Sequence, residues 1–345
     1  MLLSNRIYLD HAATTPMLPQ AIAAMADGLA RWANPSSPHA EGRAARAALE
    51  DARARIKAAL GWDGALIFTS GASEALAIAL GRAKAGRRFV SAVEHDAVRR
   101  TAADADILPV DADGVVDLAA IHGDRPLIAV QVVNNETGVV QPPVSSHFWL
   151  ADAAQAAGKI ALPDADFVAV SAHKLGGPPG IGALLIRDLA ALEASGGQEQ
   201  GYRAGTENLP AALGFAAALE AGEAWMDRAA ELRARLDTAI EAAGGIVVAR
   251  NASRLPTIAS YRMPGAAATA QLIQFDLAGI AVSAGSACSS GSLKSSHVLA
   301  AMGWNEAAAR EVVRVSFGPS TTSDELDRFI AEWTKIARNT RTRAA

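Results

Sequence analysis

The chain is short of the residues on which several classes of protein depend. Only one of its 345 residues is a cysteine, Cys288, so a disulfide within the chain is impossible and no cysteine-based zinc site is expected. Aromatic residues account for 5% of the sequence, and alanine is frequent, which is typical of closely packed helices. No apolar run is long enough to span a bilayer, and the N-terminal segment lacks the apolar stretch of a signal peptide. We therefore expect a cytoplasmic protein without a metal site or a membrane partner.

Charge is also distributed without a strong bias. The formal net charge is −4, and no block of lysine and arginine marks a surface for nucleic acid or anionic lipid. Half of the residues are hydrophobic, which supports a large buried core and argues against disorder. A chain of this length has room for two domains.

Short apolar segments alternate with helical ones in the first two thirds of the chain. Residues 65–70 form a predicted strand, and residues 72–83 form a predicted helix. Further buried strands are predicted within residues 87–98, 126–135 and 167–173. Apolar strands separated by helices indicate a largely parallel sheet that is covered on both faces.

The pattern changes near Asn208. Residues 208–244 are predicted as one long helix that ends at a pair of glycines. Strands are then predicted within residues 255–263, 279–292 and 312–318, and a capping box from Thr322 to Glu325 opens the last helix. This part is typical of a smaller α+β domain.

Two polar positions follow predicted strands, and each has two interpretations. Ser70-Gly71-Ala72-Ser73 leads from a strand into a helix, where free N–H groups favour an anion such as a phosphate. Taken alone, this segment is more often an ordinary helix cap by Ser70 or Ser73. Asp152 stands at the end of an apolar segment. A carboxylate that is buried there is costly unless it meets a cation, such as a protonated pyridine nitrogen. The alternative is again an N-cap, for the helix expected to follow.

Lys174 gives these positions a common explanation. It stands just beyond an apolar strand, about 22 residues after Asp152, and a lysine has little structural reason to be there. Pyridoxal 5′-phosphate needs a lysine to form an imine, an acid at its ring nitrogen and an anion site for its phosphate. All three features occur where strands end, which is where α/β sheets bind ligands. The ordered set predicts a site for pyridoxal phosphate.

Nine sequence motifs then point to one family. In order they are "YLDHAATTP", "NPSS", "FTSGASEA", "EHDAV", "NNETGVVQP", "DAAQAAGK", "SAHKLGGPPGIGAL", "YRAGTEN" and "SAGSACSSGS". From Tyr8 to the 320s the chain resembles the cysteine desulfurases of the NifS/IscS type, within the class V, fold-type I enzymes that use pyridoxal phosphate. The resemblance implies a mostly parallel, seven-stranded sheet in a large domain, residues 12–225. It also implies a smaller α+β domain, residues 1–11 and 226–345.

The resemblance also implies roles for individual residues. Lys174 is the Schiff-base lysine, Asp152 is the partner of the pyridine nitrogen, and His95 stacks on the ring and moves protons. The other implied cofactor contacts are Ala72, Ser73, Ser171, His173 and, from a partner subunit, Thr206 at the phosphate, and Asn135 and Gln155 near the phenolic oxygen. The family more often has threonine at the position of Ser73.

Three further residues are implied on the substrate side. Arg314, alone among apolar residues in "VVRVSFG", matches the clamp on the substrate α-carboxylate, for which a guanidinium is suited. Without the resemblance it is an edge arginine with a buried stem. Asn34 is a weaker candidate for the same carboxylate. Cys288 lies among small residues instead of bulky apolar ones, and it matches the nucleophile.

The implied reaction removes sulfur from L-cysteine, giving L-alanine and a persulfide on Cys288. The sulfur then passes to an acceptor or scaffold protein, as in iron–sulfur cluster assembly. Thr206 implies a homodimer with shared sites. Two alternatives stay open: another class V enzyme, such as a selenocysteine lyase or an aminotransferase, and a scaffold homologue without activity.

One segment departs from the family pattern. Between "NNETGVVQP" and "LADAAQ" the family has a helix and then a strand, but here only "PVSSHFW" intervenes. This segment is too short for that helix. We expect Phe148 and Trp149, or a partner, to cover the exposed sheet face, and the position of Asp152 depends on this segment.

Overall fold

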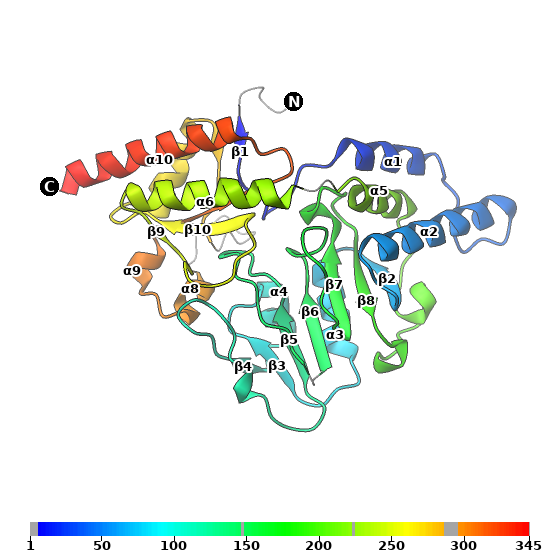
Figure 1. Cartoon of the computed structure of the whole chain (residues 1–345). Helices are drawn as coiled ribbons and strands as arrows, with labels where there is room; N and C mark the ends of the chain where they lie inside the picture. Colours follow the sequence, from blue (N-terminus) through cyan, green and yellow to red (C-terminus); the bar gives the residue numbers. More distant parts are fainter. Residues whose placement is uncertain (1–5, 146–147, 223–224, 286–295, 345) are drawn as a thin grey trace.

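A seven-stranded sheet forms the centre of the computed structural model, which describes residues 6–145, 148–222, 225–285 and 296–344 (Figure 1). Its strand order is β2-β8-β7-β6-β5-β3-β4. The strands β7, β6, β5, β3 and β4 pair in parallel, whereas β8 is antiparallel to both of its neighbours. The bounds are β2 Ala65–Thr69, β3 Arg88–Ser91, β4 Asp106–Leu108, β5 Leu127–Gln131, β6 Phe148–Asp152, β7 Phe167–Ser171 and β8 Gly182–Ile186. The predicted mostly parallel sheet is confirmed.

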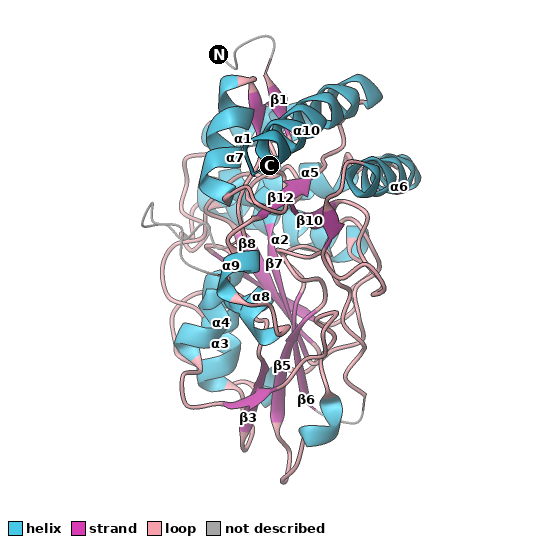
Figure 2. Ribbon diagram, turned by 90° about the vertical axis from the view of Figure 1, so that its left-hand side faces the viewer, coloured by secondary structure: helices cyan, strands magenta, loops and turns pink. Residues whose placement is uncertain are grey.

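Both faces of this sheet are covered, because alternate side chains of each strand enter different cores. Ile128 and Val130 of β5 belong to the core that includes α2 and α5, whereas Leu127 and Ala129 belong to the core on the side of α3. Figure 2 shows α3 and α4 together on one side of the sheet. The helix bounds are α1 Pro19–Leu29, α2 Ala40–Ala59, α3 Ala72–Arg82, α4 Asp96–Thr101 and α5 Leu209–Glu220.

A second, smaller unit contains the N-terminal strand and the rest of the chain (Figure 1). Its sheets are β12-β10-β9, which is antiparallel, and β1-β11, which is parallel. The strand bounds are β1 Ile7–Tyr8, β9 Ile246–Val247, β10 Ile258–Arg262, β11 Ile280–Ala281 and β12 Val312–Ser316. The helix bounds are α6 Met226–Ala242, α7 Ala268–Leu277, α8 His297–Ala301, α9 Glu306–Ala309 and α10 Ser323–Ala344.

Aromatic packing holds this smaller unit together. Phe275 of α7 stacks on Phe329 of α10 with a ring-centroid distance of 5.0 Å and also stacks on Trp333, against which Tyr261 packs edge-on. The predicted capping box at the start of α10 is confirmed, since Thr322 and Glu325 exchange backbone-to-side-chain hydrogen bonds of 2.8 and 3.3 Å. The core of this unit contains Ile7, Leu9 and residues from Trp225 onward. The domain bounds given above stay a prediction.

Four short 3-10 helices complete the described chain. They are Leu118–Ala120, Ala172–Lys174, Leu189–Ala191 and Glu199–Gly201. Within the described ranges, no helix combines the length and the apolar character needed to cross a membrane.

The single long helix predicted over residues 208–244 is wrong. The chain forms two helices instead, because α5 ends at Glu220 and α6 begins at Met226. Phe215 of α5 packs in the core of the large sheet, whereas Leu236 of α6 packs in the core of the smaller unit. One straight helix cannot serve both cores, and Gly222 lies at the break, where glycine lowers helix stability.

The short segment before β6 leaves the sheet topology intact. Trp149 is only 3% exposed, belongs to the core on the α5 side and donates from its indole nitrogen to the carbonyl of Val130 at 3.2 Å. Phe148 packs on the opposite face against Phe167, with ring centroids 5.2 Å apart. Trp149 therefore covers the α5 side of β5 and β6 as expected, but Phe148 does not. Asp152 remains the last residue of a parallel strand between β5 and β7.

Candidate active site

A cavity of about 1010 Å³ opens where β6 and β7 end and α3 begins. Residues of the smaller unit complete its wall, so the site lies between the two parts of the fold. The sequence-predicted residues that line it are Ala72, Ser73, His95, Asn135, Asp152, Gln155, Ser171, His173, Lys174 and Arg314. Asn34 and Thr206 do not line it, and Cys288 lies outside the described residues.

Lys174 follows β7 in a single 3-10 turn, which turns its side chain toward the N-terminal segment. Its Nζ donates to the carbonyls of Ala12 and Ala13 at 2.7 and 2.8 Å. Burial lowers the pKa of Lys174 to about 8, and the nearby guanidinium of Arg314 contributes to this shift. About a tenth of the amine is therefore uncharged at pH 7, far more than for an ordinary lysine, and the uncharged form is the nucleophile.

Asp152 ends β6, and its side chain is buried beside this amine. Its Oδ1 accepts a hydrogen bond from the backbone N–H of Ala154 at 2.9 Å. Burial raises the pKa of Asp152, and the N–H of Ala154 together with His95 and Lys174 opposes that shift. The residues after Asp152 form turns and not a helix, so the alternative of a helix cap is wrong. A buried carboxylate in this position is suited to a cationic ring nitrogen.

The N-terminus of α3 faces the same cavity without a side-chain cap. Its N-cap residue is Gly71, and neither Ser70 nor Ser73 caps the helix, so the capping interpretation of these serines is wrong. Gly71 has φ 153°, a backbone conformation that residues other than glycine rarely adopt. The hydroxyl of Ser171 lies next to Gly71 in the cavity. Uncapped N–H groups and a hydroxyl make a site suited to a phosphate.

The two sequence-predicted histidines of the cavity wall each have one ring nitrogen engaged. Nδ1 of His95 accepts from the N–H of Ala97 at 3.1 Å, so His95 caps α4 while its ring remains exposed. Nδ1 of His173 lies 3.2 Å from the hydroxyl of Thr14. Burial and the neighbouring Lys174 lower the pKa of His173 to about 4, so its imidazole is neutral at physiological pH.

Gln155 lies in the wall of the cavity. Its Nε2 donates to the carbonyl of Ala12 at 2.9 Å, and its buried Oε1 has no partner among the described residues. An unpaired buried amide oxygen is costly unless a ligand supplies a donor. Asn135 follows β5 and binds Arg314 through its backbone carbonyl, which leaves its side chain available to a ligand.

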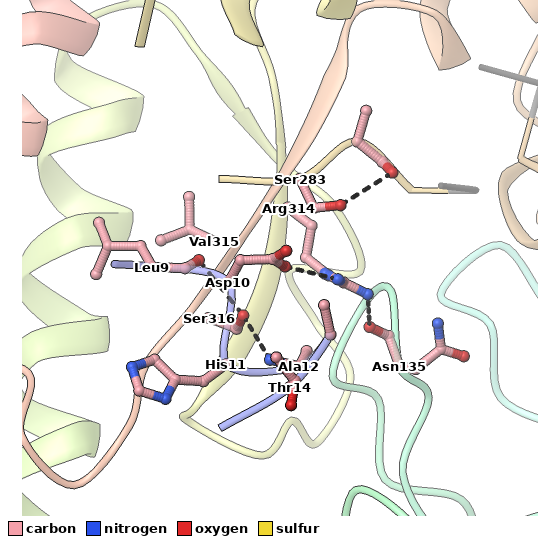
Figure 3. A network of polar contacts seen from close by, with 12 residues as sticks. Leu9, Asp10, His11, Ala12, Thr14, Asn135, Ser283, Arg314, Val315 and Ser316 are labelled. Carbon is pink, nitrogen blue, oxygen red and sulfur yellow. Dashed lines mark hydrogen bonds and ion pairs between the residues drawn. The ribbon is translucent and has the colours of Figure 1, made fainter. Parts of the chain in front are cut away.

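Arg314 extends from β12 into the cavity between Asp10 and Asn135 (Figure 3). Its Nη2 donates to Oδ1 of Asp10 at 2.8 Å and its Nη1 donates to the carbonyl of Asn135 at 2.9 Å. Its Nε is buried and has no partner in the described part of the chain. The guanidinium therefore keeps hydrogen-bond donors for an anionic ligand.

Thr206 and Asn34 lie apart from this cavity. Both are exposed, and Oδ1 of Asn34 accepts from the N–H of Ser36 at 2.8 Å in a local turn. The segment that leads to Thr206 is held by Glu199, whose buried carboxylate accepts from both terminal nitrogens of Arg53 at 2.7 and 3.0 Å. Thr206 is thus presented at the surface by a fixed segment, which is compatible with a role in a neighbouring subunit.

Sequence patterns assign no role to Asp10 or Lys159. Asp10 lines the cavity, whereas Lys159 lines a neighbouring cavity that shares Lys174 with it. Asp10 lies in a motif that carries the family resemblance, but its partner Arg314 is 304 positions away. Lys159 follows a glycine in a turn, where a lysine is usually a solvated residue. Its Nζ donates to the carbonyl of Gln155 at 3.1 Å. Burial lowers the pKa of Lys159 to about 7, and Lys174 contributes to this shift.

Lys159 predicts a pH dependence of stability in the protein without a cofactor. Between about pH 7 and pH 10 the unfolded chain keeps the proton on Lys159 and the folded chain does not, so the free energy of unfolding rises with pH. We expect Lys159→Met to reduce this slope by at most about 1.4 kcal/mol per pH unit. Urea unfolding at pH 7, 8 and 9 measures it.

Lys84→Met is the matched control, because Lys84 is exposed. Its slope should equal that of the unchanged protein. An unchanged slope in Lys159→Met would mean that the amine of Lys159 is solvated in solution.

The chain is similar to known proteins over nearly its whole length. The family profile described as aminotransferase class-V matches residues 7–329. A cysteine desulfurase of Rhodobacter capsulatus is 38% identical over 363 residues, covering 94% of each chain. The putative cysteine desulfurase IscS 1 of Bacillus subtilis is 36% identical, covering 93% of this chain and 96% of its own. A solved structure of a NifS-like protein from Rickettsia africae superposes with a TM-score of 0.87 at 29% identity, covering 97% of this chain and all of its own.

Proposed function

Because the chain belongs to the class-V aminotransferase family, and within it to the cysteine desulfurases, we propose that Lys174 carries pyridoxal 5′-phosphate for the removal of sulfur from L-cysteine. The observation that carries this proposal is the meeting of three features in one cavity. These are the partly uncharged amine of Lys174, the buried carboxylate of Asp152 and the uncapped start of α3. The enzyme releases L-alanine and keeps the sulfur as a persulfide.

The residues present fit this cofactor. Asp152 would hold the protonated ring nitrogen, and the N–H groups of Ala72 and Ser73 would hold the phosphate with the help of Ser171 and His173. His95 would lie against the ring, and Gln155, with its unpaired oxygen, and Asn135 would serve the phenolic oxygen. When bound, pyridoxal phosphate supplies an electron-accepting ring that stabilises negative charge at the substrate Cα.

Lys174 has a second task once the substrate has bound. Its freed amine accepts the Cα proton, and the carbonyls of Ala12 and Ala13 hold the resulting ammonium group. The lowered pKa of about 8 suits this exchange, since the amine both gains and loses a proton near neutral pH. Arg314 orients the substrate through its α-carboxylate, with Asn34 as a further candidate.

Cys288 completes the reaction as nucleophile. Its thiolate attacks the substrate sulfur, the substrate Cβ–S bond breaks, and its electron pair stays on the carbon skeleton, which is protonated to L-alanine. The sulfur remains on Cys288 until an acceptor or scaffold protein takes it, for iron–sulfur cluster assembly or another sulfur pathway. The proposal includes a cytoplasmic homodimer in which Thr206 reaches the phosphate of the neighbouring subunit.

The test is an assay of the protein loaded with pyridoxal phosphate. Incubation with L-cysteine and a thiol reductant should yield alanine and sulfide in equal amounts. Formation of a keto acid from added amino donors would indicate an aminotransferase instead, and activity restricted to selenocysteine would indicate a selenocysteine lyase. The absence of cofactor absorbance would favour a scaffold without activity.

A further inference from the structure

Asp10 and Arg314 form an ion pair in the wall of the cavity (Figure 3). The distance from Nη2 of Arg314 to Oδ1 of Asp10 is 2.8 Å, and their side chains are 6% and 21% exposed, respectively. No partner for Oδ2 of Asp10 is present among the described residues. One carboxylate oxygen is therefore free on the side of the pair that remains partly open.

The backbone holds both members of the pair in place. Asp10 forms a parallel bridge with Ser316, and Arg314 forms an antiparallel bridge with Ser283 through hydrogen bonds of 2.6 and 3.2 Å. The N–H of Ala12 also donates to the hydroxyl of Ser316 at 2.8 Å. The two charges thus face the cavity from neighbouring, rigid segments, and little conformational entropy is lost when a ligand binds.

We propose that Asp10 binds the α-ammonium group of the incoming amino acid while Arg314 binds its α-carboxylate. The inference rests on the proposed function, in which Arg314 is the carboxylate clamp, and adds a residue that selects amino acids over other carboxylates. In a zwitterion the ammonium and the carboxylate are joined through one carbon, so two adjacent fixed charges of opposite sign complement it.

The position of the amine of Lys174 supports this assignment. Asp10 is one of the two carboxylates that raise the pKa of Lys174 against the effect of burial, so its charge acts at the point where the amino group must arrive. Asp10 and Lys174 also line the same cavity. A carboxylate here attracts a substrate ammonium toward the amine of Lys174. The unpaired Nε of Arg314 and the second hydrogens of its two terminal nitrogens remain as donors for the substrate carboxylate.

The test compares L-alanine with propionate, which differ only in the amino group. Both are titrated by ligand-observed NMR against protein whose cofactor has been fixed to Lys174 by borohydride reduction, so that neither ligand reacts with it. In Asp10→Asn, which keeps an oxygen for Arg314, the Kd of L-alanine should rise on the order of tenfold to a hundredfold. The Kd of propionate should change by less than about twofold, within the variation expected for an unaltered contact.

Two outcomes would contradict the inference. Equal weakening of both ligands would mean that Asp10 only positions Arg314, and tighter binding of both would mean that Asp10 competes with the ligand carboxylate. Asp10→Ser repeats the comparison if Asp10→Asn does not fold, and Asp10→Glu should keep a preference for L-alanine. Because the measurement needs no turnover, protein that binds L-alanine through Asp10 but releases no sulfur would contradict the proposed function and not this inference.

Discussion

Replacement of Lys174 by alanine is expected to abolish both the yellow absorbance of bound cofactor and the release of alanine from L-cysteine. Lys174 provides the attachment point and the proton acceptor, so turnover should fall by about 10²- to 10⁴-fold or more. Absorbance spectra and an amino-acid assay of alanine measure the two losses separately. Both measurements are needed, because a loss of activity alone has many causes. Loss of the covalently held chromophore points specifically to the amine of Lys174.

Lys84→Ala is the control for Lys174→Ala, since Lys84 is exposed and lies outside the cavity. It should keep both the absorbance and the activity. Cofactor absorbance of unchanged position and stability in Lys174→Ala would place the cofactor on another amine, and Lys159, whose pKa is about 7, would be the next candidate.

Replacement of Cys288 by serine is expected to leave the cofactor in place and to stop sulfur transfer. A serine hydroxyl cannot accept the substrate sulfur, so alanine formation should fall on the order of 10³-fold or more. Intact-protein mass spectrometry after exposure to L-cysteine should show a gain of one sulfur atom in the unchanged protein only. Cys288 is the single cysteine of the chain, so an intact mass locates the sulfur without peptide mapping.

Lys174→Ala serves as the second arm of the Cys288 experiment. It retains Cys288 but should gain no sulfur, which separates enzymatic loading from direct chemical exchange with free cysteine. Continued release of sulfide and alanine by Cys288→Ser would instead mean that the substrate sulfur leaves directly into solution and that no protein persulfide is needed.

Local sequence alone predicts a large part of the site. Residues at the ends of β6 and β7 lie close together, because neighbouring parallel strands end at a common edge of the sheet. This explains why Asp152 and Lys174, with Ser171 and His173, could be assigned from their motifs and lie in one cavity. The capping box of Thr322 and Glu325 is equally local, since its two hydrogen bonds join residues three positions apart.

Features that depend on which core a segment enters could not be predicted in this way. Residues 208–244 have one continuous helical pattern, but α5 and α6 pack in different cores, so the break is decided by tertiary packing. Ser70 and Ser73, on either side of the start of α3, suit a helix cap by type, yet Gly71 is the N-cap residue and the helix start has no side-chain cap.

The amino-acid sequence determined the chemistry that this protein offers: a lysine and a carboxylate at the edge of a sheet, with one thiol in the chain. Only the tertiary structure decided how those groups are tuned, which groups join them and that the start of α3 is left without a side-chain cap. Burial lowers the pKa of Lys174 to about 8, and the fold brings Asp10 to 2.8 Å from Arg314 across 304 positions of sequence. Desolvation and long-range pairing arise from the packed interior, and no local pattern of residues encodes them.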